Sequence, residues 1–103
     1  MKHALFGGVV SVLAASPALA QQATPAMPQV ASTCLSCHGA NGRPTLADVP
    51  IIAGQQELYL ANALLAYRTG RRNGGQALVM QEMVKHLTDD DIATLANWFG
   101  AQK

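Results

Sequence analysis

Hydrophobic positions divide this chain into an apolar leader and three later segments whose apolar residues recur at helical spacing. In the leader, Lys2 precedes an uncharged run of 12 residues from Ala4 to Ala15, and the small residues Ala18-Leu19-Ala20 follow. This order is typical of a secretory signal peptide, and the run is shorter than the roughly 20 residues that span a membrane. We predict a signal peptide over residues 1–20, cleaved after Ala20, with a retained N-terminal anchor as the alternative.

The first segment with helical spacing follows a polar lead-in over residues 21–27, which is rich in proline and alanine and is expected to be a flexible tether. A helix is expected to begin near Pro28, because proline suits the first position of a helix. Val30, Cys34 and Cys37 then recur at i, i+4 and i+7, so they share one face. Glycine, asparagine and proline residues end this helix and open a long loop.

The second segment predicts a helix over roughly Gln55 to Thr69. Gly70 is well placed to end it, because glycine readily adopts the left-handed conformation that follows many helices. Arg71 to Ala77 contain consecutive turn-forming residues and are expected to be a surface loop. The apolar stripe of the helix consists of Leu60, Ala63, Leu64 and Tyr67, and it is widened by Leu58, Ala61 and Leu65.

The third segment has the clearest helix start in the chain. Thr88 is a good N-cap, Asp91 stands three residues later in a position resembling a capping box, and Asp89 and Asp90 favour the positive end of the helix dipole. We therefore interpret the three aspartates as helix initiation rather than metal binding. The apolar face of this helix is formed by Ile92, Leu95, Ala96 and Phe99.

No strand alternation, internal repeat or second domain is evident, so the predicted fold is all-α, with one domain over residues 28–103. Without Lys2, the remaining chain has six Lys and Arg against six Asp and Glu. This neutral balance argues against binding to nucleic acid or to an anionic membrane surface. Cleavage after Ala20 would leave 83 residues, and a core of that size is often marginal without a metal, disulfide or cofactor.

The candidate chemistry lies in Cys34-Leu35-Ser36-Cys37-His38, which has the C-x-x-C-H pattern of haem attachment. Residues three apart lie on the same side of a helix, so both thiols can bond to vinyl groups of one haem, and the next histidine can offer a ring nitrogen to the iron. A disulfide and a thiol redox pair are the alternatives. Neither requires His38, and a redox pair is typical of an alternating α/β pattern that this chain lacks.

Three stretches of the chain carry a family resemblance: the haem-attachment motif extended by Gly39, Pro50-Ile51-Ile52-Ala53-Gly54-Gln55 followed by Tyr59-Leu60, and Leu87-Thr88-Asp89-Asp90-Asp91-Ile92-Ala93. On these residues, the chain from Pro28 to Phe99 resembles the class I cytochromes c, in particular the cytochrome c4 and c553 group of bacterial electron carriers. The resemblance implies an all-α fold whose first and last helices cross beside the haem, with Leu95 and Phe99 facing the Cys34 helix and Trp98 near the contact.

The second axial ligand of the iron is sought among Met27, Met80, Met83 and His86. A thioether suits ferrous iron and raises the reduction potential when it is paired with histidine. The resemblance implies a ligand methionine eight residues before the cap of the final helix, and Met80 has that offset from Thr88. We therefore predict His38 and Met80 as iron ligands, with Met83 and a bis-histidine centre using His86 as alternatives.

The resemblance also implies roles for residues of the central loop and helix. The carbonyl of Pro50 is expected to accept a hydrogen bond from the second nitrogen of His38, which would orient the imidazole. Ile52, Tyr59 and Leu64 are expected to contact the haem. Either Arg72 or Gln55 is a candidate for reaching a propionate, whereas Arg68 and Arg71 are expected to lie on a solvated surface.

The predicted function is that of a periplasmic carrier that moves one electron at a time through a covalent haem c, and not that of an enzyme. The expected partners are redox proteins, such as a dehydrogenase, a cytochrome complex or a terminal oxidase, docked through a small interface; a membrane is approached only through such complexes. One alternative is the cytochrome subunit of a flavin- or quinone-dependent dehydrogenase. Another is a haem protein that binds or senses a gas.

Overall fold

The computed structural model describes residues 2–14 and 25–103. Residues 2–14 form neither helix nor strand, and their side chains are exposed. The predicted cleavage site at Ala20 and most of the predicted tether lie outside the described residues. In the described part, no helix has the length and apolar character needed to cross a membrane.

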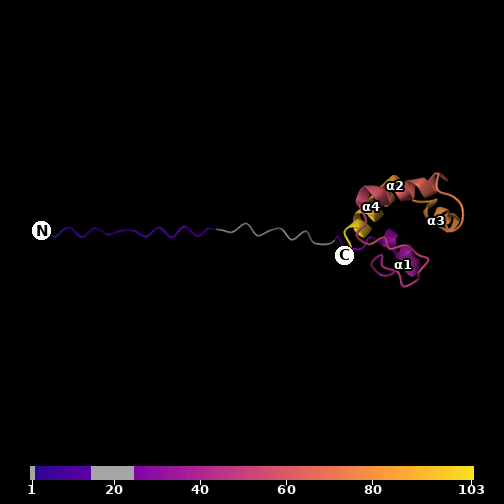
Figure 1. The fold of residues 1–103 in the computed structure, drawn as a ribbon. Coiled ribbons are helices and arrows are strands. Elements are labelled where there is room, and N and C mark those ends of the chain that lie inside the picture. The colour runs from indigo at the N-terminus through magenta and orange to yellow at the C-terminus, as the bar shows by residue number, and fades with distance from the viewer. Residues whose placement is uncertain (1, 15–24) are drawn as a thin grey trace.

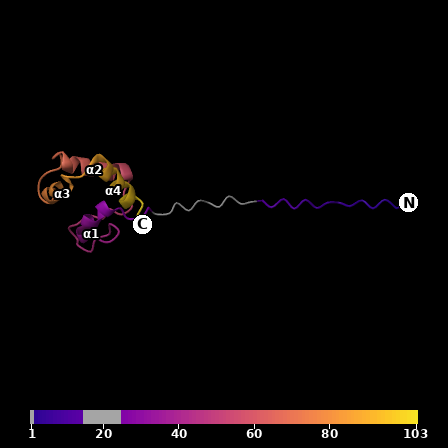
Figure 2. The same ribbon diagram turned by 180° about the vertical axis from the view of Figure 1, so that it is seen from behind.

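The described part of the chain is helical and contains no strand, which confirms the predicted all-α class. Figures 1 and 2 show α2 and α4 side by side, with α1 and α3 at separate corners of the fold. Helix α2 packs against both α4 and α3, and α4 also contacts η1. In chain order, the elements are the 3-10 turn η1 (Gln29–Ala31) and the helices α1 (Ser32–His38), α2 (Glu57–Arg68), α3 (Ala77–Val84) and α4 (Asp89–Gly100).

Helix α4 begins as the sequence predicts. The Thr88 hydroxyl oxygen accepts a hydrogen bond from the Asp91 amide at 3.1 Å, and the Asp91 carboxylate accepts one from the Thr88 amide at 3.0 Å. Together they form a reciprocal capping box. These bonds hold the pKa of the Asp91 carboxyl below its usual value, because the backbone and side chain of Thr88 favour the ionised form.

The first two helices begin later than predicted. Pro28 is followed by η1 before the α-helix starts at Ser32, and its carbonyl accepts a 3-10 bond from the Ala31 amide at 3.0 Å. Helix α2 begins at Glu57 rather than Gln55. The Gln55 side chain donates to the carbonyl of Ile51 at 3.0 Å, so this residue belongs to the preceding loop.

Helix α3 was not predicted; its residues stand in the sequence between the expected surface loop and the final helix. The predicted loop over Arg71 to Ala77 ends one residue too late, because Ala77 is the first residue of α3. The helix has only eight residues, and Gln76 before it makes no side-chain cap hydrogen bond. Its sequence is nearly apolar throughout, so no helical period stands out.

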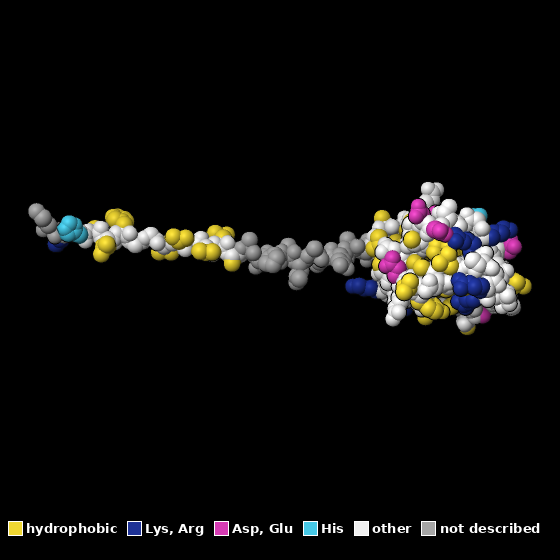
Figure 3. Space-filling view, turned by 90° about the horizontal axis from the view of Figure 1, so that it is seen from above, with side chains coloured by type: hydrophobic (Ala, Val, Ile, Leu, Met, Phe, Trp, Pro, Cys, Tyr) yellow, Lys and Arg dark blue, Asp and Glu magenta, His cyan; other side chains and the backbone are white. Residues whose placement is uncertain are grey.

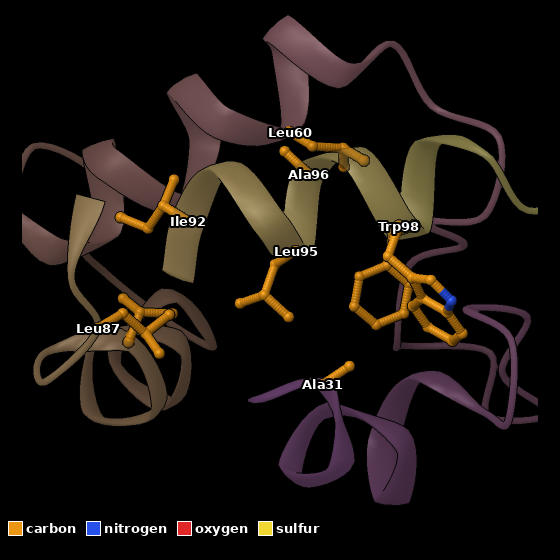
Figure 4. Close-up of a cluster of buried hydrophobic side chains, with 9 residues drawn as sticks. Ala31, Leu60, Leu87, Ile92, Leu95, Ala96 and Trp98 are labelled. Atoms are coloured by element: carbon orange, nitrogen blue, oxygen red, sulfur yellow. The ribbon is translucent and has the colours of Figure 1, made fainter. Parts of the chain in front are cut away.

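The core lies around α4, which buries Leu95 and Phe99 against residues of η1, α2 and the α3–α4 connection (Figure 4). Trp98 is also buried, and its ring meets that of Phe99 edge to face at 4.8 Å between centroids. Cys34 and Leu35 of α1 pack against this cluster. The cluster comprises Ala31, Leu60, Val84, Leu87, Ile92, Leu95, Ala96, Trp98 and Phe99.

Arg68 corrects one prediction. We expected it on a solvated surface, but its side chain is only 24% exposed. It donates to the Leu87 carbonyl at 3.0 Å and forms an ion pair with Asp89. Arg68 therefore joins the end of α2 to the start of α4, whereas Arg71 is exposed as expected.

Candidate functional site

A cavity of about 730 Å³ lies beside the core, among α1, the loop that follows it, and the other three helices. A volume of several hundred cubic ångströms with mostly apolar walls is typical of a cofactor site. Polar and sulfur-bearing side chains also reach it, and several of them can be assigned a role individually. The side chains that bear on the chemistry include those of Cys34, Cys37, His38, Tyr67 and Met80.

The two cysteines lie three residues apart on α1, and both line this cavity. Cys34 is half-buried, Cys37 is exposed, and they do not form a disulfide. Burial raises the pKa of the Cys34 thiol, because the thiolate is poorly solvated there. A thiol redox pair is typically activated by a lowered pKa, so this environment argues against that alternative.

His38 is the last residue of α1 and is only 8% exposed. Its Nδ1 lies 3.1 Å from the Pro50 carbonyl oxygen. A carbonyl can only accept, so this contact requires the tautomer in which Nδ1 carries the proton. Nε2 is then left with a lone pair that can bind a metal, and the imidazole is held in one orientation.

Among the candidate second ligands, Met80 lines the cavity from α3 and is half-buried. Met83, on the same helix, is 39% exposed and does not line the cavity. Met27 and His86 are exposed and are likewise absent from the cavity wall. Of these four candidates, the structure therefore brings only Met80 to the cavity that His38 lines.

The remaining walls contain the residues expected from the resemblance. Ile52, Tyr59 and Leu64 all line the cavity. Gln55 and Arg72 line it as well, so both remain candidates for a propionate. We did not predict that Arg72 would lie over the ring of Tyr67, with the guanidinium carbon 4.4 Å from the ring centroid, a cation–π arrangement.

Two cavity-lining residues, Asp48 and Gln76, were given no role by the sequence. The Gln76 side-chain amide donates to the Asp48 carboxylate at 3.0 Å across 28 residues of chain. They are polar residues in two separate loops and belong to no motif. Only their proximity in the folded chain identifies Asp48 and Gln76 as an interacting pair.

The donor set fits a covalent haem rather than a bare metal ion. Cys34, Cys37 and His38 line the cavity from α1, and Met80 lines it from α3. Within residues 2–14 and 25–103, no three His, Cys, Asp or Glu side chains gather as a metal site would require. Cys34 and Cys37 could bond to the vinyl groups, and His38 and Met80 could offer axial ligands.

The family model for cytochrome c matches residues 26–101. The chain belongs to the cytochrome c family. It is a class I, single-haem member that binds haem c covalently, and cytochromes c are electron carriers rather than enzymes.

Curated relatives agree with this assignment. Cytochrome c-554(548) of Halomonas halodenitrificans is 39% identical over 69% of this chain and 86% of its own length. Cytochrome c4 of Pseudomonas aeruginosa is 36% identical over 71% of this chain, and the "Thiosulfate dehydrogenase electron acceptor" of Thiomonas intermedia is 37% identical over 76%. The matched region spans only 35% of each of these two longer proteins.

Proposed function

We propose that this cytochrome is a single-electron carrier whose iron is held by His38 Nε2 and Met80 Sδ, with Cys34 and Cys37 as the thioether anchors. The observation that carries the proposal is the convergence of Met80 and His38 on one cavity from α3 and α1. When bound, haem c supplies an iron that alternates between the ferric and ferrous states.

The side chains of the cavity would support the alternation of the iron between the ferric and ferrous states. The Pro50 carbonyl keeps the His38 imidazole in one orientation, so the ligand does not rearrange between oxidation states. The thioether of Met80 is a soft donor that favours ferrous iron. The apolar walls supplied by Leu64, Leu95 and Phe99 exclude water, which lowers the solvent rearrangement that accompanies each transfer.

We further propose that the chain is exported to the periplasm, with residues 1–20 as a cleaved signal peptide, residues 21–27 as a tether and residues 28–103 as the haem domain. Its partners would be a dehydrogenase, a cytochrome complex or a terminal oxidase. The face of the globular part in Figure 3 mixes positive, negative and hydrophobic side chains, which suits brief docking with another protein.

A second candidate function is that of an electron-accepting partner dedicated to one dehydrogenase. This candidate is favoured by relatives with the name "Thiosulfate dehydrogenase electron acceptor". It requires the same haem and ligands, so it differs from a free carrier only in its partner. Copurification with a dehydrogenase at a fixed ratio would favour this second candidate.

The ligand assignment is tested by absorption spectra of protein produced in an exporting host with a haem-attachment system. The oxidised wild type should show the weak long-wavelength band of methionine-ligated ferric iron. Met80→Ala should abolish this band and permit carbon monoxide binding after reduction. Met83→Ala is the matched control and should retain the band. Loss of the band in Met83→Ala but not in Met80→Ala would reverse the assignment.

A further inference from the structure

One hydrogen bond joins the loop on the histidine side of the cavity to the segment on the methionine side. The donor is the Gln76 side-chain amide and the acceptor is Asp48 Oδ2, at 3.0 Å. Both residues line the cavity, and both are exposed. The bond therefore lies where the cavity meets solvent.

Each partner is close in sequence to a residue that serves the iron. Asp48 stands two residues before Pro50, whose carbonyl bonds to His38. Gln76 is the N-cap of α3, and its carbonyl accepts from the Val79 amide at 3.1 Å and, more weakly, from the Met80 amide at 3.5 Å. The bond therefore couples the backbone that orients one proposed ligand to the first turn of the helix that carries the other.

Few other links could replace it. Besides the His38–Pro50 contact, the loop after α1 is attached to the far end of the chain, through the Gly54 amide to the Phe99 carbonyl at 2.9 Å and Arg43 to the Lys103 carbonyl at 2.7 Å. Between residues 39–54 and residues 70–84, all of which the structure describes, the Gln76–Asp48 bond is the only hydrogen bond. Among hydrogen bonds between these two segments, this bond alone opposes movement of α3 away from the loop, while α3 also packs against α2.

We propose that the hydrogen bond between Asp48 and Gln76 forms a clasp. The clasp keeps Met80 bound to the iron, so that competing ligands do not reach the position that Met80 occupies. The proposal rests on the ligation by His38 and Met80 proposed above. Both members of the clasp are positioning residues that act through α3 and the Pro50 loop. Opening the clasp lets α3 move with Met80, and an external ligand can then reach the vacated position.

The test uses a swap that preserves the shapes of both side chains. Gln76→Glu places two carboxylates face to face and breaks the clasp. Adding Asp48→Asn restores a donor and an acceptor in exchanged positions, because Asn is isosteric with Asp and Glu with Gln. Gln76→Ala removes the donor without adding charge. Gln56→Glu is the matched control, since Gln56 is exposed and lies outside the cavity wall.

The readout is the rate at which carbon monoxide binds to the reduced holoprotein, followed by rapid mixing, with denaturant unfolding measured in parallel. Gln76→Glu and Gln76→Ala should bind carbon monoxide about three- to tenfold faster than the wild type, as expected for loss of one exposed hydrogen bond. The double variant should return to the wild-type rate, and Gln56→Glu should not depart from it.

Four outcomes would contradict the account, and they are distinguishable. A wild type without the methionine band refutes the proposed ligation itself. If the band is present but Gln76→Glu binds carbon monoxide no faster than Gln56→Glu, the ligation stands and the clasp is wrong. If the double variant remains as fast as Gln76→Glu, or if the rates only follow the unfolding free energies, pairing between residues 48 and 76 does not control access.

Discussion

At the scale of single residues, the surroundings of the side chains in the site determine which chemical role each can have. Burial and the Pro50 carbonyl leave His38 one free nitrogen. Burial raises the pKa of the Cys34 thiol, which favours a role as an attachment point over a role as a redox thiol. Arg72 adds a positive charge to the cavity wall, and it is held there by the face of Tyr67.

The charge of Arg72 should raise the reduction potential, because a nearby cation disfavours the more positive ferric state. We expect Arg72→Gln to lower the potential by an amount on the order of tens of millivolts. Arg43→Gln is the control, because Arg43 lies outside the cavity wall and bonds to the Lys103 carbonyl. Spectroelectrochemical titration of both variants measures the effect. Equal shifts of the reduction potential in the two variants would show that the potential depends only on the net charge of the protein and not on the position of Arg72.

At the scale of the elements, α4 organises the molecule. It buries its apolar face in the core and contributes Leu95, Ala96 and Phe99 to the cavity wall. Its start is held by the capping box of Thr88 and Asp91 and by Arg68, which contacts both the Leu87 carbonyl and Asp89. Because α4 also lines the cavity, the bonds that hold the start of this helix help to maintain the shape of the haem site.

The lowered pKa of the Asp91 carboxyl makes the stability of the domain depend on pH. The stabilisation is fully present above the pKa of the unfolded carboxyl, about 3.9, and is lost as pH falls through the lower folded value. Urea unfolding should therefore show less stability as pH falls from about 5 to about 2. Asp91→Asn should weaken this dependence more than Asp90→Asn does, and an equal effect of both would exclude the capping box as its cause.

At the scale of the whole molecule, sequence patterns predicted the parts that depend on local spacing. The C-x-x-C-H motif and the Thr88–Asp91 pair each act within one helical turn, so both could be identified without the fold. Helix α3 could not, because its short apolar sequence has no distinctive period. The Arg68 contacts and the Asp48–Gln76 clasp join residues 19 to 28 positions apart, so they could be found only after the chain is folded.

The most direct test of a carrier with one His38- and Met80-ligated haem is a potentiometric titration of the purified holoprotein, followed through its haem absorption. We predict one reversible transition with a slope of about 59 mV per tenfold change, as a single-electron couple requires, and loss of the methionine band on reduction. Absence of covalent haem, a transition that is not reversible, or an oxidised spectrum without the methionine band would contradict the account.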